Sequence, residues 1–290
     1  MRTAIAALFD RSDATLAAAA VAAEAALADE ASFCVAEASV ELLAPIYDPE
    51  KVICVGMNYA DHCSEQGIAI PKEPLLFNKW PSAIIASGED IVMPGATRKL
   101  DFEVEMVVVV GKRARHVRKE HAMEYVAGFS VAHDVSARDL QLEMAGGQWM
   151  LGKCFDTSCP LGPAIVTTDS IKDPHALRLT CELNGEVVQD SSTAQMVFKT
   201  ADIIEYASRF FTLSPGDIIL TGTPPGVGCF RKPEPLWLKP GDVVTCTVEG
   251  IGSVTNKVVA DPVSEIPPAG VRPAAAAAAA AAPSFAAASE

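Results

Sequence analysis

Short apolar runs separated by turns dominate the middle of this chain. Runs of this length, bounded by glycine, proline and asparagine, are typical of β-strands. An Asn-Gly-Glu turn at 184–186 predicts a hairpin. The runs are VICVG, AIIASG, EVEMVVVVG, GFSVAHDV, AIVTT, LRLTCELNGEVV, DIILTGTP and DVVTCTVEGIGSV. Because strands outnumber helices and do not alternate with them regularly, the pattern favours a mostly β, α+β fold over a Rossmann sheet. A barrel or sandwich with peripheral helices fits best.

Helical patterns are few and mostly short. They are expected at 12–31, 60–66, 137–144 and 201–211. Gly67 is a natural residue to follow the second helix, and Ser136 and Thr200 are plausible N-caps of the last two. The segment that leads into the main body, from Ala38 to Tyr59, predicts two short strands separated by a proline turn.

Three regions are expected along the chain. Residues 1–50 form an N-terminal arm with an alanine-rich helix and short strands, and residues 51–262 form the main, catalytic domain. Residues 263–290 are a low-complexity tail rich in alanine and proline. Such a tail cannot build a core, so disorder is predicted for it.

The composition limits the partners. The chain has 290 residues and is half hydrophobic, and 23 basic against 37 acidic side chains give a formal charge of −14. An acidic protein is a poor partner for nucleic acid or anionic membranes, and no apolar stretch resembles a transmembrane span. We therefore expect a soluble intracellular protein, cytoplasmic or in the mitochondrial matrix, without a clear targeting peptide. Its eight cysteines include no CxxC pair, which indicates buried free thiols and not a zinc site.

Three carboxylates are the strongest chemical signal. Glu103 and Glu105 lie two apart at the start of a predicted strand, so they point to the same face. Asp134 follows the next long apolar run. Carboxylates without soft ligands beside them suit a hard divalent cation such as Mg²⁺ or Mn²⁺. Such an ion would chelate an oxo-acid and stabilise the enolate derived from it.

Two further pairs share helical faces. His62 and Glu65 are three residues apart, so a carboxylate can raise the basicity of the imidazole and fix its tautomer. Arg138 and Gln141 have the same spacing after Asp134, and an arginine fork suits a substrate carboxylate.

The blocks that hold these residues resemble the fumarylacetoacetate hydrolase superfamily. The matching blocks, in the family's order, are VGMNYADHCSE, DFEVEMVVVVGK, VAGFSVAHDVSARD, GKCFDTSCPLGP, LNGEVVQ and TGTPPGVG. Within the family, the resemblance is greatest to the fumarylacetoacetate hydrolase domain-containing protein 2 group. It implies a mixed β-roll, a homodimer, and one Mg²⁺ or Mn²⁺ held by Glu103, Glu105 and Asp134. The larger hydrolases have a fourth acidic ligand, for which this chain offers no clear equivalent.

The resemblance also assigns roles to single residues. It implies that His62 and Glu65 lie on a mobile lid and activate water or move a proton, and that Lys153 lies near the oxygen that the metal polarises. Arg138, Gln141 and Thr223 match substrate-binding positions, with Thr223 on a loop whose amides can hold a carboxylate. From the residues alone, Asp101 shares the strand parity of the two glutamates and is expected to be an outer-shell partner. His133 is expected to order the site, whereas His116, His121 and His175 are expected to face solvent.

These features predict an enzyme that acts on a small anionic 2-oxo dicarboxylate or β-diketo acid through an enolate. Reprotonation of the enolate gives keto–enol tautomerisation, as of oxaloacetate, which we rank first. Acylpyruvate-type or fumarylacetoacetate-type C–C hydrolysis and oxaloacetate decarboxylation are the alternatives. A non-catalytic metal-binding scaffold is a further alternative, which a missing ligand or a missing His–Glu pair would favour.

Overall fold

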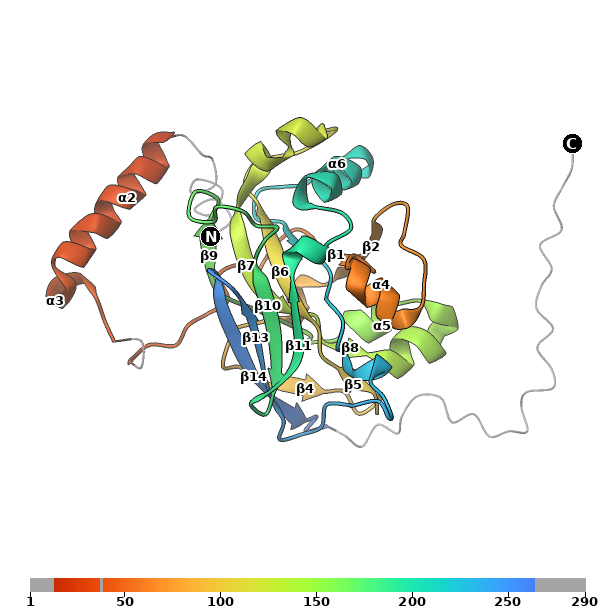
Figure 1. Cartoon of the computed structure of the whole chain (residues 1–290). Coiled ribbons are helices and arrows are strands. Elements are labelled where there is room, and N and C mark those ends of the chain that lie inside the picture. Colours follow the sequence, from red (N-terminus) through yellow and green to blue (C-terminus); the bar gives the residue numbers. More distant parts are fainter. Residues whose placement is uncertain (1–12, 37–38, 264–290) are drawn as a thin grey trace, which may run out of the picture.

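The computed structural model describes residues 13–36 and 39–263 (Figure 1). Two β-sheets form the body, and a third sheet consists of one pair of short strands. The seven-stranded sheet has the order β2 (Leu75–Lys79), β1 (Val52–Gly56), β12 (Ile218–Leu220), β6 (Val104–Val110), β7 (Val126–His133), β9 (Cys159–Thr167) and β3 (Ile84–Ile85). The five-stranded sheet has the order β11 (Glu186–Ser192), β10 (Arg178–Leu183), β13 (Val243–Val248), β14 (Gly252–Ala260) and β4 (Ile91–Met93). The short pair is β5 (Leu100–Asp101) with β8 (Ser136–Ala137).

Helices lie around the sheets, as expected. The α-helices are α2 (Asp13–Ala28), α3 (Glu30–Phe33), α4 (Ala60–Gln66), α5 (Met150–Lys153) and α6 (Thr200–Phe210). The 3₁₀ helices are η2 (Pro81–Ala83), η3 (Lys119–Tyr125), η5 (Ala145–Gly147), η6 (Thr193–Gln195) and η7 (Gly228–Phe230), and η4 (Asp139–Glu143) is a π-helical turn. Within the described residues, no helix combines the length and apolarity needed to cross a membrane.

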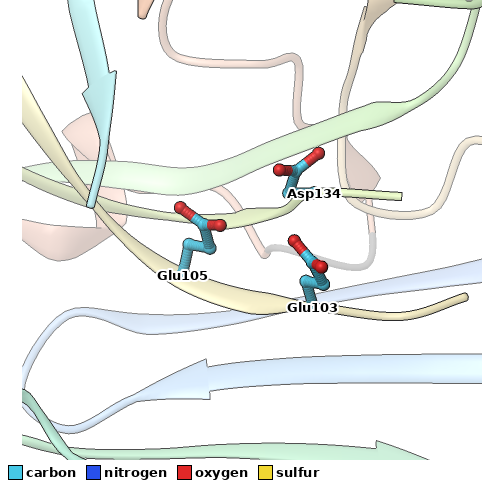
Figure 2. A group of neighbouring side chains, drawn as sticks. All are labelled: Glu103, Glu105 and Asp134. Carbon is cyan, nitrogen blue, oxygen red and sulfur yellow. The ribbon is translucent and has the colours of Figure 1, made fainter. Parts of the chain in front are cut away.

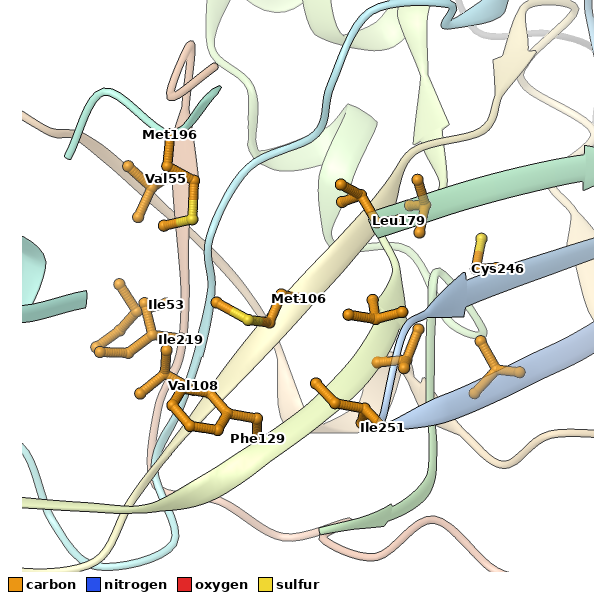
Figure 3. Packing of buried hydrophobic residues seen from close by; sticks show 14 of the residues in the cluster. Ile53, Val55, Met106, Val108, Phe129, Leu179, Met196, Ile219, Cys246 and Ile251 are labelled. Carbon is orange, nitrogen blue, oxygen red and sulfur yellow. The ribbon is translucent and has the colours of Figure 1, made fainter. Parts of the chain in front are cut away.

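The prediction of a mostly β fold is confirmed. Strand β6 lies at the centre of the fold, and its burial explains why its apolar run in the sequence is continuous. Met106 and Val108 belong to a buried cluster that also includes Leu179 and Cys246 of the five-stranded sheet (Figure 3). Val107 and other alternate residues belong to a second cluster on the opposite face. Because both faces of the strand are buried, it shows no polar alternation over this stretch. The central strands are therefore rigid supports for whatever lies at their ends.

Several local predictions are confirmed. Helix α4 ends where predicted, and Gly67 takes the left-handed conformation that suits a residue after a helix (φ 66°). The hairpin turn between β10 and β11 also forms, with positive φ at Asn184 and Gly185. The eight cysteines carry no disulfide, and six of them are buried. Two histidines, His116 and His121, are exposed as expected.

The first of the two strands predicted in the N-terminal arm is wrong. Residues 39–50 form no strand, and β1 begins only at Val52. Pro45 and Pro49 lack the N–H that a ladder needs, and Ile46 is the only non-proline residue of this segment that is buried, against the seven-stranded sheet. A single anchoring side chain thus replaces a strand. The predicted tail and residues 1–12 lie outside the described residues.

The predicted helix at 137–144 is also wrong in type. Ser136 belongs to β8 and does not cap a helix, and one π-helical turn, η4, follows. The buried carboxylate of Asp139 accepts hydrogen bonds from the hydroxyl of Thr97 and the amide of Arg98 (2.8 Å). These contacts tie the turn to a distant loop, so tertiary hydrogen bonds override the local helical pattern.

At α6 the predicted cap is displaced by one residue. Lys199 is the N-cap, and its amide donates to Asp202 Oδ2 (3.0 Å), whereas Thr200 is the first helical residue. The amide of Thr200 donates to Nε2 of His175 (3.2 Å). The His175 side chain is only 22% exposed, so its prediction as a solvent-facing residue is wrong. It serves the helix start because four helical N–H groups there lack intrahelical partners.

Candidate active site

Strand register brings the three predicted metal ligands together. In the antiparallel β6–β7 pair, Glu105 lies opposite Ala132, and the amide of Asp134 donates to the carbonyl of Glu103 (2.9 Å). Directly opposed residues share a face of a sheet, so all three carboxylates lie on the same side of the pair. Figure 2 shows them pointing toward one another. One oxygen from each lies within 4.8 Å of the others, and all three side chains are buried.

The charge balance of these acids is uneven. Burial opposes ionisation of Glu103, but the ammonium of Lys153 and the guanidinium of Arg138 outweigh it and lower its pKa to about 2. The pKa of Glu105 shifts in the opposite direction. Burial, followed by the charges of Asp134 and Glu103, raises the pKa of Glu105 well above its usual value. This cluster therefore carries a like-charge repulsion that a bound cation would relieve.

Two buried lysines accompany the acids. Lys153, at the end of α5, donates to Glu103 Oε2 and Asp134 Oδ2, both at 2.8 Å. Lys79, at the end of β2, lies 2.8 Å from Asp134 Oδ1 and donates to the carbonyls of Val135 and Lys153. The sequence interpretation missed Lys79. Its signal was weak, since a lysine at a strand end usually reaches solvent, but here it is 1% exposed.

The residues present fit a divalent metal. Their donor atoms are three carboxylate oxygens, one on strand β6 and two directly beside the ends of β6 and β7, which is the hard oxygen set that Mg²⁺ and Mn²⁺ prefer. Glu105 accepts one protein hydrogen bond, from the amide of Gly222 to Oε2 (2.6 Å). The charges that act on it most strongly are the carboxylates of Asp134 and Glu103, which outweigh the ammonium of Lys153, so the arrangement favours a cation over further protein donors.

Asp101 is placed differently from the sequence expectation. It lies on the separate strand β5 and not on β6, so shared parity with Glu103 does not position it. It is fully buried, and its Oδ2 accepts from Nε of Arg138 (2.8 Å). Arg138 also donates to Glu103 Oε1 (2.5 Å) and Gln141 Oε1 (3.0 Å). Asp101 thus acts on the predicted ligand Glu103 through the guanidinium between them.

The loop after β12, residues 221–229, supplies backbone amides to the site. Gly222 binds Glu105, and Gly226 donates to Glu65 Oε1 (2.9 Å). Gly228 and the residue after it donate to the two oxygens of Asp101. These amides thus bind acids of the protein itself. The predicted substrate-binding residue Thr223 is 5% exposed, donates to the carbonyl of Val104 and accepts from Gln189 Nε2, both at 2.9 Å.

The His62–Glu65 pair forms as its spacing predicts. Nδ1 of His62 lies 2.8 Å from Glu65 Oε2 on helix α4, and His62 is 5% exposed. Ser191 on β11 donates to Oδ2 of Asp61 (2.6 Å), which fixes the start of the helix against the neighbouring sheet. The helix therefore holds the imidazole over the carboxylates, inside the molecule.

One pocket collects seven of the nine predicted site residues, whereas Glu65 and Asp134 do not belong to its lining. It is lined by His62, Glu103, Glu105, Arg138, Gln141, Lys153 and Thr223, together with Gln66, Val55, Gly56, Met57, Phe77, Leu142, Trp149 and Phe230. The apolar part of this lining excludes water, while the charged groups converge at its base. His133 does not belong to it. Register pairs His133 with Val104, so its side chain lies on the opposite face of the sheet from Glu105.

Comparisons with known proteins find relatives that match most of this chain. A mitochondrial oxaloacetate tautomerase of Bos taurus is 58% identical over 220 residues, which cover 76% of this chain and 70% of the relative. The structure of a 2-hydroxyhepta-2,4-diene-1,7-dioate isomerase from Mycobacterium marinum has a TM-score of 0.68 at 40% identity, covering 78% of this chain and 80% of that one. A fumarylpyruvate hydrolase from Pseudomonas aeruginosa, solved with Mn²⁺ and pyruvate, has a TM-score of 0.67 at 33% identity, covering 73% and 91%.

The family match spans most of the chain. The family described as fumarylacetoacetate (FAA) hydrolase, C-terminal, matches residues 51–259. That stretch contains every residue of the pocket described above. It also contains all three sheets that position the pocket, except for the last residue of β14. The chain belongs to the fumarylacetoacetate hydrolase family.

Proposed function

We propose that this protein is a divalent-metal-dependent oxaloacetate keto–enol tautomerase. The observation that carries the proposal is the convergence of Glu103, Glu105 and Asp134 within 4.8 Å of one another, with Glu103 and Glu105 lining a pocket and the ammonium of Lys153 between Glu103 and Asp134. The similarity to a tautomerase over most of the chain supports the choice of substrate. A metal held by the three carboxylates, with Mg²⁺ preferred and Mn²⁺ as the alternative, would polarise a 2-oxo-carboxylate and make its C3 protons acidic.

The residues of the chain have distinct tasks in this proposal. Lys153 Nζ lies where it can donate to the enolate oxygen of the substrate and return a proton to it. Arg138 and Gln141 line the same pocket and bind the distal carboxylate, with Thr223 at its wall. The apolar walls around Trp149 and Phe77 exclude water from the enol.

A second activity has its own supporting observation. The His62–Glu65 hydrogen bond (2.8 Å) is the arrangement of a general base, which could activate water for C–C hydrolysis of an acylpyruvate. The similarity to a fumarylpyruvate hydrolase supports this candidate.

We also propose a homodimer and a mitochondrial location, the latter because related proteins carry that label.

The decisive experiment follows the decay of enol-oxaloacetate by its ultraviolet absorbance, with and without Mg²⁺, beside acetylpyruvate cleavage. We expect metal-dependent decay of the enol that exceeds cleavage of acetylpyruvate. A rate of enol decay that depends on neither the protein nor the metal would refute the proposal. Faster cleavage of acetylpyruvate than decay of the enol would favour the hydrolase.

The variant His62→Ala separates the two candidates further. A general base contributes about 10²–10⁴-fold, so any hydrolysis that the wild type performs through His62 should be lost in the variant. Tautomerisation should fall less, because Lys153 remains to move the proton. Small and equal losses on both substrates would show that the pair is not catalytic.

A further inference from the structure

Both ring nitrogens of His62 have partners on the same short helix. Glu65 Oε2 lies 2.8 Å from Nδ1, and Nε2 of Gln66 lies 2.9 Å from the other ring nitrogen, Nε2 of His62. The three residues are at i, i+3 and i+4, so one face of α4 carries all of them. Gln66 was not part of the predicted site, yet it lines the pocket.

The two contacts agree on the state of the imidazole. Burial opposes ionisation of Glu65, but hydrogen bonds from His62 and the amide of Gly226 outweigh it and hold the pKa of Glu65 below its usual value. An ionised carboxylate only accepts, so Nδ1 carries the proton and Nε2 offers its lone pair. The amide nitrogen of Gln66 only donates, which matches that lone pair. The same amide group points to the sulfur of Met57 at 3.7 Å.

This arrangement matters because hydrolysis and tautomerisation use the imidazole differently. In acylpyruvate hydrolysis, the oxygen of water bonds to the distal carbonyl carbon and one water proton passes to His62 Nε2. The bond between that carbon and C3 then breaks, its electron pair stays on C3, and C3 takes up a proton, which gives a carboxylate and pyruvate. Tautomerisation moves a single proton between the enol oxygen and C3 and consumes no water.

We propose that Gln66 is a specificity-determining residue: its amide holds the Nε2 lone pair of His62, prevents that atom from binding an attacking water, and thereby directs a bound enol to reprotonation instead of C–C cleavage. The inference rests on the proposed function and deepens it. The lone pair is the only basic position of a neutral imidazole, and water must displace the glutamine to reach it. The glutamine cannot accept the proton in turn.

The test compares Gln66→Ala with Ser64→Ala, a change at an exposed position of the same helix. In Gln66→Ala, we expect acetylpyruvate hydrolysis to rise by about tenfold or more, since an available general base is worth about 10²–10⁴-fold. The rate of enol-oxaloacetate tautomerisation should differ from that of the wild type by less than about threefold. Ser64→Ala should leave both rates unchanged. The double variant His62→Ala/Gln66→Ala should lose the gain, because the gain requires the imidazole.

A spectroscopic readout separates the hydrogen bond from a merely structural role. In protein with ¹⁵N-labelled histidine, assigned with His62→Ala, the Nε2 resonance of His62 should move toward the value of an unbonded lone pair in Gln66→Ala and stay in place in Ser64→Ala. An unmoved resonance, a folded Gln66→Ala without increased hydrolysis, or an increase that survives loss of His62 would each overturn the inference. Failure of the wild type to tautomerise enol-oxaloacetate would instead refute the proposed function, while the resonance and the hydrolysis ratio still judge Gln66.

Discussion

Asp101 and Glu105 are both buried acids at the same end of the sheets, but their surroundings differ sharply. Asp101 accepts four hydrogen bonds, from Nε of Arg138 and from the amides of Phe102, Gly228 and Cys229. Among the described residues Glu105 accepts one, from Gly222, and the carboxylates of Asp134 and Glu103 act on it more strongly than the ammonium of Lys153 does. Burial alone therefore does not identify a ligand. A buried acid whose oxygens are already satisfied is structural, whereas one that faces other acids is arranged for a cation.

The largest effect should follow from Glu105→Ala. Loss of a metal ligand removes several kcal/mol of transition-state stabilisation, so enol-oxaloacetate turnover should fall by about 10³-fold or more. The apo protein should melt at an equal or higher temperature, because a charge that raises the repulsion is gone. Turnover, Mn²⁺ affinity by electron paramagnetic resonance, and thermal melting measure the three effects. Full activity with unchanged metal affinity would show that the three acids are misassigned.

A large loss of stability is expected for Lys79→Met, which leaves Asp134 with one ammonium partner fewer in a buried site. Removal of one member of a buried ion pair costs about 3–5 kcal/mol, which urea unfolding can measure. Lys119→Met is the matched control, since it breaks a pair between the exposed Lys119 and the half-buried Asp202 and should cost less than about 1 kcal/mol. Equal costs for the two variants would mean that Lys79 is not buried with its partners.

Asp101→Asn should weaken the fold and spare the metal. The amide cannot accept all four hydrogen bonds and leaves Arg138 short of a charged partner, so unfolding should become easier by about 1–3 kcal/mol. Mn²⁺ affinity should change little, in contrast with Glu105→Ala. If Asp101→Asn instead abolished metal binding and left stability intact, the distinction between the two acids would be reversed.

The smallest effect is expected at Asp242, an acid outside the pocket lining whose oxygens already accept hydrogen bonds. Burial disfavours ionisation of Asp242, but donors from Asn184 and Lys239 outweigh it and lower its pKa. A lowered folded-state pKa adds stability above the unfolded value near 3.9, and this stability disappears as pH falls through the folded value. Asp242→Asn should thus be about 1 kcal/mol less stable than wild type at pH 7, with the difference shrinking below about pH 4. A difference that is constant with pH would contradict this account.

The sequence predicted the local features of the site well because they follow from short periodicities. The spacing of Glu103 and Glu105, and of His62 and Glu65, determines shared faces without knowledge of the fold. Long-range features were missed for the converse reason. Lys79 lies 55 residues before Asp134 in the sequence, and only sheet order brings the two together. The helix predicted at 137–144 failed because Thr97 and Arg98 bind Asp139 from another segment.

The loop at 221–229 has a consequence for how the family can vary. Because backbone amides bind Glu105, Glu65 and Asp101, most of its side chains can change without loss of those bonds. Its length cannot, since one inserted or deleted residue would move every amide out of reach of its acid. Its glycines are equally constrained: a Cβ at Gly226 would lie 2.3 Å from the carbonyl oxygen of Val188. This loop should therefore tolerate amino-acid substitutions at most positions but no insertions or deletions.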